Sequence, residues 1–110
     1  MKRIAIVDIE TTGFESRKDL ILEIGVVELL LESGETNILF DSIVREKGFG
    51  NDHKDSWVLN NSDLDFEDVR DAPTLKSKKA EIQELLFSYH VTAYNSTFDF
   101  GFLRARGFKI

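Results

Sequence analysis

Two carboxylates, Asp8 and Glu10, lie one residue apart where the apolar run Arg3–Ile9 ends, and a Thr-Thr-Gly turn follows them. If the run is a β-strand, both side chains project from the same face, because alternate residues share a face. Two ionised carboxylates side by side repel each other, and a hard cation prefers oxygen ligands of this kind. The pair therefore indicates a cation site, although solvated acids also occur routinely at strand ends.

A third carboxylate, Asp99, lies in the first turn of a predicted helix, Ser96–Arg106. The positive end of a helix dipole favours an ionised carboxylate at this place. Ser96 and Asp99 also have the spacing of a capping box, in which the acid would bond back to the start of the helix. The residues alone therefore leave two interpretations of Asp99 open, a capping residue and a metal ligand.

The segments around these acids predict a mixed α/β domain that begins with three antiparallel strands. The apolar stretch Leu20–Leu31 predicts a strand, and Gly25 inside it indicates a bulge or a close backbone approach. A Glu-Ser-Gly-Glu turn follows, and Asn37–Val44 predicts the returning strand. Together with the strand at Arg3–Ile9, these segments predict a three-stranded meander.

The second half of the chain predicts a helix, a strand and a second helix. Apolar residues at helical spacing predict a helix after Pro73, with Thr74 as its N-cap and His90 at its end. A short strand is expected at His90–Tyr94, and Gly107 closes the last helix. Three strands followed by this alternation are typical of a mixed α/β architecture.

Some residues outside these motifs have ordinary structural interpretations. The segment at 45–61 is the least regular, and we expect Trp57 and Val58 to anchor it. Arg104 and Arg106 suit the negative C-terminal end of a helix.

The composition favours a soluble globular protein of one domain. The 110 residues are 42% apolar and 31% charged, and the net charge is −6. The absence of cysteine excludes disulfides and thiolate metal sites. The acidic balance argues against a broad basic face for nucleic acid, so any positive charge at such a site would have to come from metal. We see no leader and no membrane span, and we expect a cytoplasmic protein.

Two separated motifs carry a resemblance to a known family. The segment Asp8-Ile9-Glu10-Thr11-Thr12-Gly13 and the later segment Asn95-x-x-Phe98-Asp99-x-x-Phe102-Leu103 resemble the first two motifs of the DEDD-type 3′–5′ exonucleases. More narrowly, they are similar to the proofreading epsilon subunit of DNA polymerase III. The strand at 20–27 and the Asp-Ala-Pro-Thr segment before the central helix also agree with that family.

The resemblance implies a ribonuclease H-like fold and hydrolysis of DNA 3′ ends with two divalent ions, Mg²⁺ or Mn²⁺. It implies that Asp8, Glu10 and Asp99 are catalytic and hold those ions. It also implies a second set of residues near the terminal nucleotide: Thr11, Thr12, Gly13, Asn95 and Phe98. Single-stranded DNA, a polymerase or another protein, and further copies of the chain are the expected partners.

The family's third motif, a histidine or tyrosine followed by a fourth aspartate, is not found before Ile110. His53 and His90 both precede the second motif. We therefore expect residues 1–110 to be the N-terminal two thirds of a single exonuclease-type domain, C-terminally incomplete, with little or no turnover. The alternatives are a non-catalytic module that binds metal or nucleic acid, and a structural fragment that needs a partner.

Overall fold

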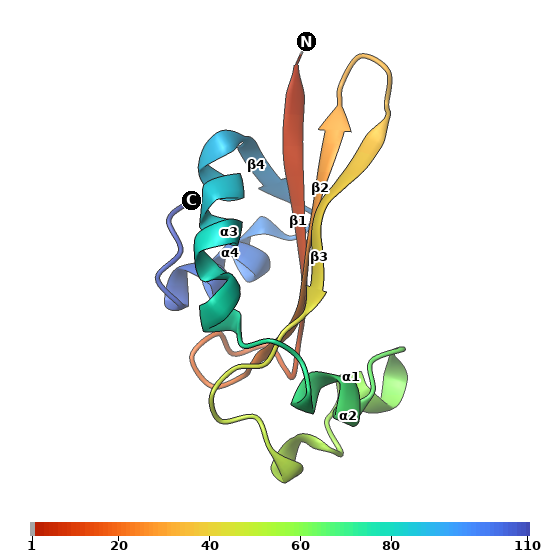
Figure 1. Ribbon diagram of the computed structural model, residues 1–110, viewed down its shortest axis with the longest axis vertical. Helices are drawn as coiled ribbons and strands as arrows, with labels where there is room; N and C mark the ends of the chain where they lie inside the picture. The colour runs from red at the N-terminus through yellow and green to blue at the C-terminus, as the bar shows by residue number, and fades with distance from the viewer. Residues whose placement is uncertain (1) are drawn as a thin grey trace.

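The computed structural model describes residues 2–110, and its central element is a four-stranded mixed sheet (Figure 1). The strands lie in the order β3-β2-β1-β4. β2 pairs antiparallel with both β1 and β3, whereas β4 pairs parallel with β1. The strand bounds are β1 Arg3–Thr11, β2 Ile21–Leu30, β3 Thr36–Ile43 and β4 His90–Ala93.

The predicted meander is confirmed, and its register fixes the neighbours of the two acids. Asp8 lies opposite Gly25 on β2, and Glu10 lies opposite Glu23. The β1–β2 register shifts just after Glu10, at the C-terminal end of β1. Gly34 adopts φ 77° in the β2–β3 turn, a left-handed conformation that glycine accepts without steric cost.

Helices α3 (Leu75–Ser88) and α4 (Ser96–Ala105) cover one face of the sheet (Figure 1). α3 begins as predicted, with the Thr74 hydroxyl accepting from the Ser77 N–H at 3.2 Å. The core between helices and sheet contains the inward residues of β1 and β2 and the apolar stripes of both helices: Ala5, Val7, Ile9, Ile24, Val26, Ile82, Leu86, Phe102 and Leu103.

A smaller group of helices lies beyond the end of the sheet where β1 ends and β2 begins (Figure 1). It comprises η1 (Asn51–His53), α1 (Trp57–Asn61) and α2 (Phe66–Arg70). Val58 packs in a second apolar cluster with Leu22 and Val69, as expected of an anchor. The expectation for Trp57 was wrong, because its side chain is 74% exposed.

The second half of the chain also departs from expectation at one residue. α3 ends at Ser88, and His90 is the first residue of β4 rather than the end of the helix. Among residues 2–110 no helix is long and apolar enough to cross a membrane.

Candidate metal and nucleic-acid site

Asp8 and Glu10 lie on the same face of β1, as the alternation predicted. Val7 and Ile9 point into the core, while Asp8 is exposed and Glu10 is half-buried. Because the residue opposite Asp8 is Gly25, the neighbouring strand places no side chain beside this carboxylate. The face of the sheet that carries both acids is therefore open at Asp8.

Asp99 is joined directly to the strand that carries the other two acids. Its side chain is buried, with 5% of the residue exposed, and its Oδ2 accepts a hydrogen bond from the Ile9 N–H at 3.2 Å. The N-cap of α4 is Asn95, whose Oδ1 accepts from the Phe98 N–H at 3.4 Å. The capping-box interpretation of Ser96 and Asp99 was wrong, because the N-cap is Asn95 and the Asp99 carboxylate accepts a hydrogen bond from β1.

The electrostatics of Glu10 and Asp99 disfavour the ionised forms of these two acids. Burial and then repulsion from Asp8, Glu23 and Asp99 raise the pKa of Glu10. Burial raises the pKa of Asp99, and the Ile9 N–H opposes this while Asp8 adds to it. Mutual repulsion of this kind is relieved by a bound cation.

Carboxylate oxygens are suitable ligands for a hard divalent ion. In this structure, however, the three carboxylates do not surround a common point. Among residues 2–110 no group of three or more histidine, cysteine, aspartate or glutamate side chains is close enough to hold a metal ion. Asp8 is exposed and Glu10 half-buried, so their side chains are less fixed by packing than that of Asp99.

The loop after β1, residues 12–20, is held by hydrogen bonds within itself. The Thr12 hydroxyl donates to Asp19 Oδ1 at 3.1 Å and accepts from the Leu20 N–H at 3.0 Å. The Thr11 hydroxyl donates to the Gly13 carbonyl at 2.6 Å. A Cβ on Gly13 would lie 2.5 Å from the Asp19 carboxylate, so a larger residue there would displace this carboxylate from its bonds to Thr12 and the Glu15 N–H. Thr11, Thr12 and Gly13 thus build the loop beside the acids.

A hollow of about 300 Å³ lies between this loop and the start of α4. Its lining contains two of the predicted substrate residues, Asn95 and Phe98, together with Phe14. The Phe14 ring is 90% exposed and meets Phe98 edge-on at 6.2 Å between centroids. The sequence interpretation missed Phe14, although its position directly after the Gly13 turn was a usable signal.

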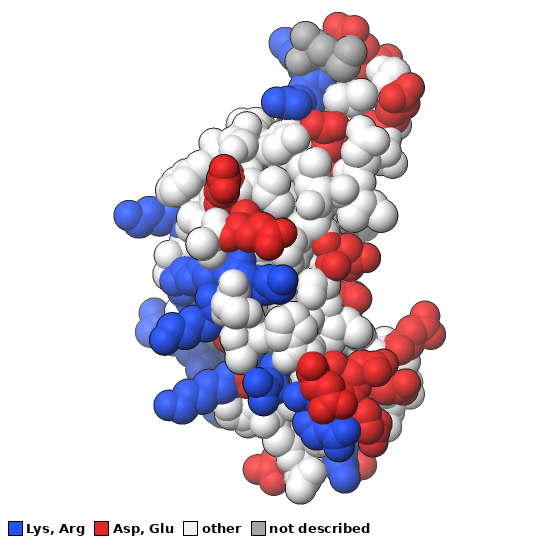
Figure 2. Space-filling model, viewed as in Figure 1, with Lys and Arg blue, Asp and Glu red and all other residues white. Residues whose placement is uncertain are grey.

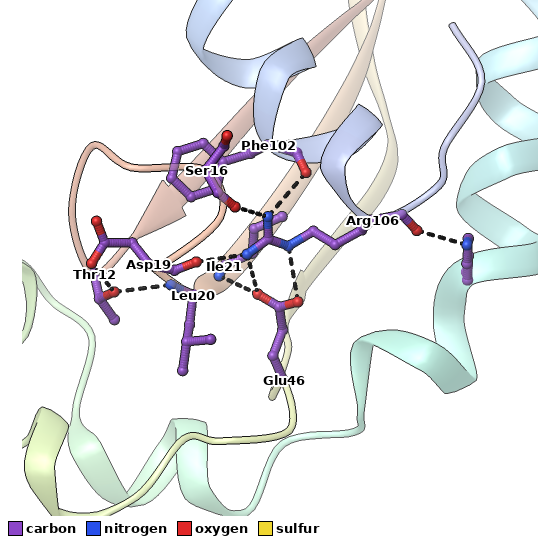
Figure 3. Close-up of polar contacts among 9 residues, drawn as sticks. Thr12, Ser16, Asp19, Leu20, Ile21, Glu46, Phe102 and Arg106 are labelled. Atoms are coloured by element: carbon purple, nitrogen blue, oxygen red, sulfur yellow. Dashed lines mark hydrogen bonds and ion pairs between the residues drawn. The ribbon is translucent and has the colours of Figure 1, made fainter.

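The sequence interpretation also missed a polar network at the C-terminal end of α4 (Figure 3). Arg106 pairs with Glu46 at 2.9 Å and donates to the carbonyls of Ser16 and Asp19 in the 12–20 loop. Arg106 therefore bonds a distant loop rather than only complementing the end of its helix.

Charge is unevenly distributed over this acidic protein. Figure 2 shows many Lys and Arg side chains along the side on which α3 lies, with some Asp and Glu among them, and a concentration of Asp and Glu over the α1–α2 region. A larger hollow of about 780 Å³ borders the start of α3, and its lining contains Arg45, Lys47, Lys76 and Lys79. Several basic side chains thus gather around the start of α3 despite the net charge of −6.

Comparisons with known proteins show similarity to an exonuclease family and to DNA polymerases. The profile of the family RNase_T, described as "Exonuclease", matches residues 5–110. The chain is 31% identical to the PolC-type DNA polymerase III of Clostridium perfringens over 99 residues, and 28% identical to that of Staphylococcus haemolyticus over 100 residues. These matches cover 90% and 89% of the chain but 6% of each relative, so the chain spans a small part of these proteins.

A solved structure shares the fold. The crystal structure of cell-death related nuclease 4 superposes with a TM-score of 0.68 over 96% of this chain and 39% of that protein, at 10% sequence identity. The sheet order, with β1 parallel to β4, is that of the ribonuclease H-like fold of DEDD exonucleases. With the family profile matching almost its whole length, this chain belongs to the RNase_T exonuclease family.

Proposed function

We propose that this chain holds the metal ions and the 3′ end in a 3′–5′ exonuclease that hydrolyses single-stranded DNA. The observation that carries the proposal is the hydrogen bond from the Ile9 N–H to Asp99. It brings an acid from a helix to the backbone between Asp8 and Glu10, so the carboxylate of Asp99 lies beside the segment of β1 that carries the other two acids. The membership of an exonuclease family supports a nucleic-acid substrate.

In this proposal Asp8, Glu10 and Asp99 hold two divalent ions, Mg²⁺ or Mn²⁺. The ions would activate water and stabilise the departing oxyanion of the phosphodiester. Asp99 is fixed by its Ile9 bond, whereas Asp8 and Glu10 would turn toward it when a cation binds. Binding would also relieve the repulsion that raises the pKa of Glu10 and Asp99.

The hollow beside Phe14 and Phe98 is the proposed place of the terminal nucleotide. An exposed aromatic ring offers a stacking surface to any base, which suits an enzyme without sequence preference. Asn95 faces the same hollow. Thr11, Thr12 and Gly13 support this place by shaping the loop, since both hydroxyls already bond within it. The similarity to PolC-type DNA polymerase III favours DNA as substrate and a polymerase as partner.

A second candidate is a module that binds metal and DNA without cleaving it. Neither histidine lies beside the acids: His53 stacks on Phe49, and His90 pairs with Ile4 toward the other end of β1. A base that takes the proton from water is therefore not provided by these two residues. This placement predicts slow turnover by these 110 residues and favours the binding module as the alternative.

Thermal melting with and without metal tests the proposal. At Mn²⁺ about a hundredfold above its dissociation constant, stabilisation of about 2.7 kcal/mol should raise the melting temperature by about 10 °C. Asp8→Asn should abolish the rise, whereas Asp63→Asn, in an exposed acid of the α1–α2 region, should preserve it. An unchanged rise in Asp8→Asn would place the metal elsewhere. Incubation of a 5′-labelled oligonucleotide with Mn²⁺ then separates the exonuclease from the binding module.

A further inference from the structure

The 12–20 loop is attached to α4 at the end opposite Asp99, through Arg106. Resting on the proposed function, we propose that Arg106, paired with Glu46, is a positioning residue. It fixes the 12–20 loop, and with it Phe14, against the helix that carries Phe98. The pair of rings that would receive the terminal nucleotide is thus set by a guanidinium that does not touch the nucleotide.

Every N–H of the Arg106 guanidinium donates a hydrogen bond (Figure 3). Nε and Nη2 donate to the two carboxylate oxygens of Glu46, each at 2.9 Å. Nη1 donates to the carbonyls of Ser16 at 2.6 Å and Phe102 at 3.1 Å, and Nη2 donates to the Asp19 carbonyl at 2.6 Å. A planar guanidinium with five satisfied donors has one geometry, so the carbonyls that it binds are fixed relative to α4.

Glu46 orients the guanidinium and is itself held in place. Its Oε2 also accepts from the Ile21 N–H at 2.7 Å, at the first residue of β2. The side chains of Arg106 and Glu46 are only 15% and 14% exposed, so solvent screens the pair weakly. The Arg106–Glu46 pair therefore links α4, the start of β2 and the loop between β1 and β2.

The loop needs this link because its internal bonds do not fix its outer part to α4. The bonds of Thr12 with Asp19 and Leu20 join the two ends of the loop to each other. Phe14 is almost fully exposed, so packing does little to hold its ring near Phe98. The Ser16 and Asp19 carbonyls, which follow Phe14 in the loop, are the points that Arg106 attaches to the helix.

A purely structural role must be separated from positioning. Removing Arg106 alone leaves the Glu46 carboxylate partly buried without its partner, which destabilises the fold. The double variant Arg106→Met with Glu46→Gln removes both charges and keeps an acceptor for the Ile21 N–H. It restores much of the stability but not the bonds to the Ser16 and Asp19 carbonyls. Arg104→Met, in an exposed arginine of the same helix, is the matched control.

The experiment measures oligonucleotide affinity, Mn²⁺ affinity and amide exchange at a temperature where each variant is folded. For the double variant we expect faster exchange of the Lys18 and Asp19 amides and unchanged Mn²⁺ affinity. Its affinity for a 5′-labelled single-stranded oligonucleotide should fall roughly three- to tenfold, the range expected when a binding loop must be ordered on association. Arg104→Met should match the unmodified chain in all three measurements.

Three results would overturn the inference. The first is a double variant that binds the oligonucleotide as tightly as the unmodified chain. The second is a double variant that loses Mn²⁺ affinity and oligonucleotide affinity equally, which would indicate general damage to the fold. The third is an unmodified chain that binds no oligonucleotide. If the oligonucleotide affinity falls in the double variant as expected but the unmodified chain shows no Mn²⁺ binding, the proposed metal function alone would be contradicted.

Discussion

The carboxylate of Asp99 accepts a hydrogen bond from the backbone N–H of Ile9, with 3.2 Å between Oδ2 and N. The bond joins the first turn of α4 to β1 at the residue between Asp8 and Glu10. It holds a buried acid near two others, and repulsion from Asp8 contributes to the raised pKa of both Glu10 and Asp99. Repulsion among these acids therefore destabilises the site unless a cation is present.

Substitutions of Asp99 should separate its structural role from its role toward metal. Asp99→Ala leaves the buried Ile9 N–H without a partner and should cost about 1–3 kcal/mol of unfolding free energy. Asp99→Asn keeps an acceptor and removes a repelled charge, so without metal it should be at least as stable as the unmodified chain. Urea unfolding checks both, and equal stability of the two variants would mean that the Ile9 bond contributes nothing.

As the pH falls, metal binding should begin to weaken at a higher pH than it would at a site of carboxylates with ordinary pKa values. The ionised forms of Glu10 and Asp99 bind the cation, and their raised pKa values let protons compete closer to neutral pH. Without metal the sign is opposite, because raised folded-state pKa values make stability fall as pH rises through them. The Mn²⁺-induced shift in melting temperature, measured between about pH 5 and pH 8, should therefore increase with pH. A shift independent of pH would argue against these two acids.

Gly13→Ala should disturb the loop beside the acids. The new Cβ would lie 2.5 Å from the Asp19 carboxylate, which could move only by giving up its bonds to Thr12 and the Glu15 N–H. We expect a loss of about 1–3 kcal/mol in unfolding free energy, as for overpacked sites. Gly101→Ala, where a Cβ meets nothing within 4 Å in the middle of α4, should stabilise by about 0.5–1 kcal/mol. Thermal melting checks the two variants, and equal melting temperatures for Gly13→Ala and Gly101→Ala would contradict the prediction.

Glu28 should make stability depend on pH in the opposite direction to Glu10. Hydrogen bonds from Tyr89 and Asn37, and the nearby Arg3 guanidinium, lower the pKa of Glu28. A lowered folded-state pKa adds stability above the unfolded-state pKa, and this stability is lost as pH falls through the folded value. Glu28→Gln should therefore lower the melting temperature at neutral pH. Its melting curve should approach that of the unmodified chain in acid, and a constant difference would exclude the ionised form as the cause.

The sequence predicted the features that depend on local pattern. Alternation placed Asp8 and Glu10 on one face of a strand, and helical spacing after Thr74 predicted α3. The meander followed from three apolar segments and the turn at Gly34. These are properties of neighbouring residues, so the chain alone reveals them.

The missed features depend on partners far apart in the chain. The Asp99–Ile9 bond and the Arg106–Ser16 bond each join residues separated by 90 positions, and the Arg106–Glu46 bond joins residues 60 positions apart. Local rules assigned Asp99 and Arg106 to the ends of their own helix, because no pattern states which distant group a side chain will meet. The prediction that Trp57 is an anchor was wrong for a related reason, because a large apolar side chain is buried only where the fold provides apolar neighbours.

The most direct test of the central claim locates Mn²⁺ by the broadening of amide signals in the NMR spectrum of the ¹⁵N-labelled chain. The metal site proposed at Asp8, Glu10 and Asp99 predicts that substoichiometric Mn²⁺ broadens first the amides of residues 8–11 and 96–100. The acidic α1–α2 region is the internal comparison, because it offers many exposed carboxylates, including Glu67 and Asp68. Broadening that begins in that region, or that spreads uniformly over the acidic surface, would contradict the claim.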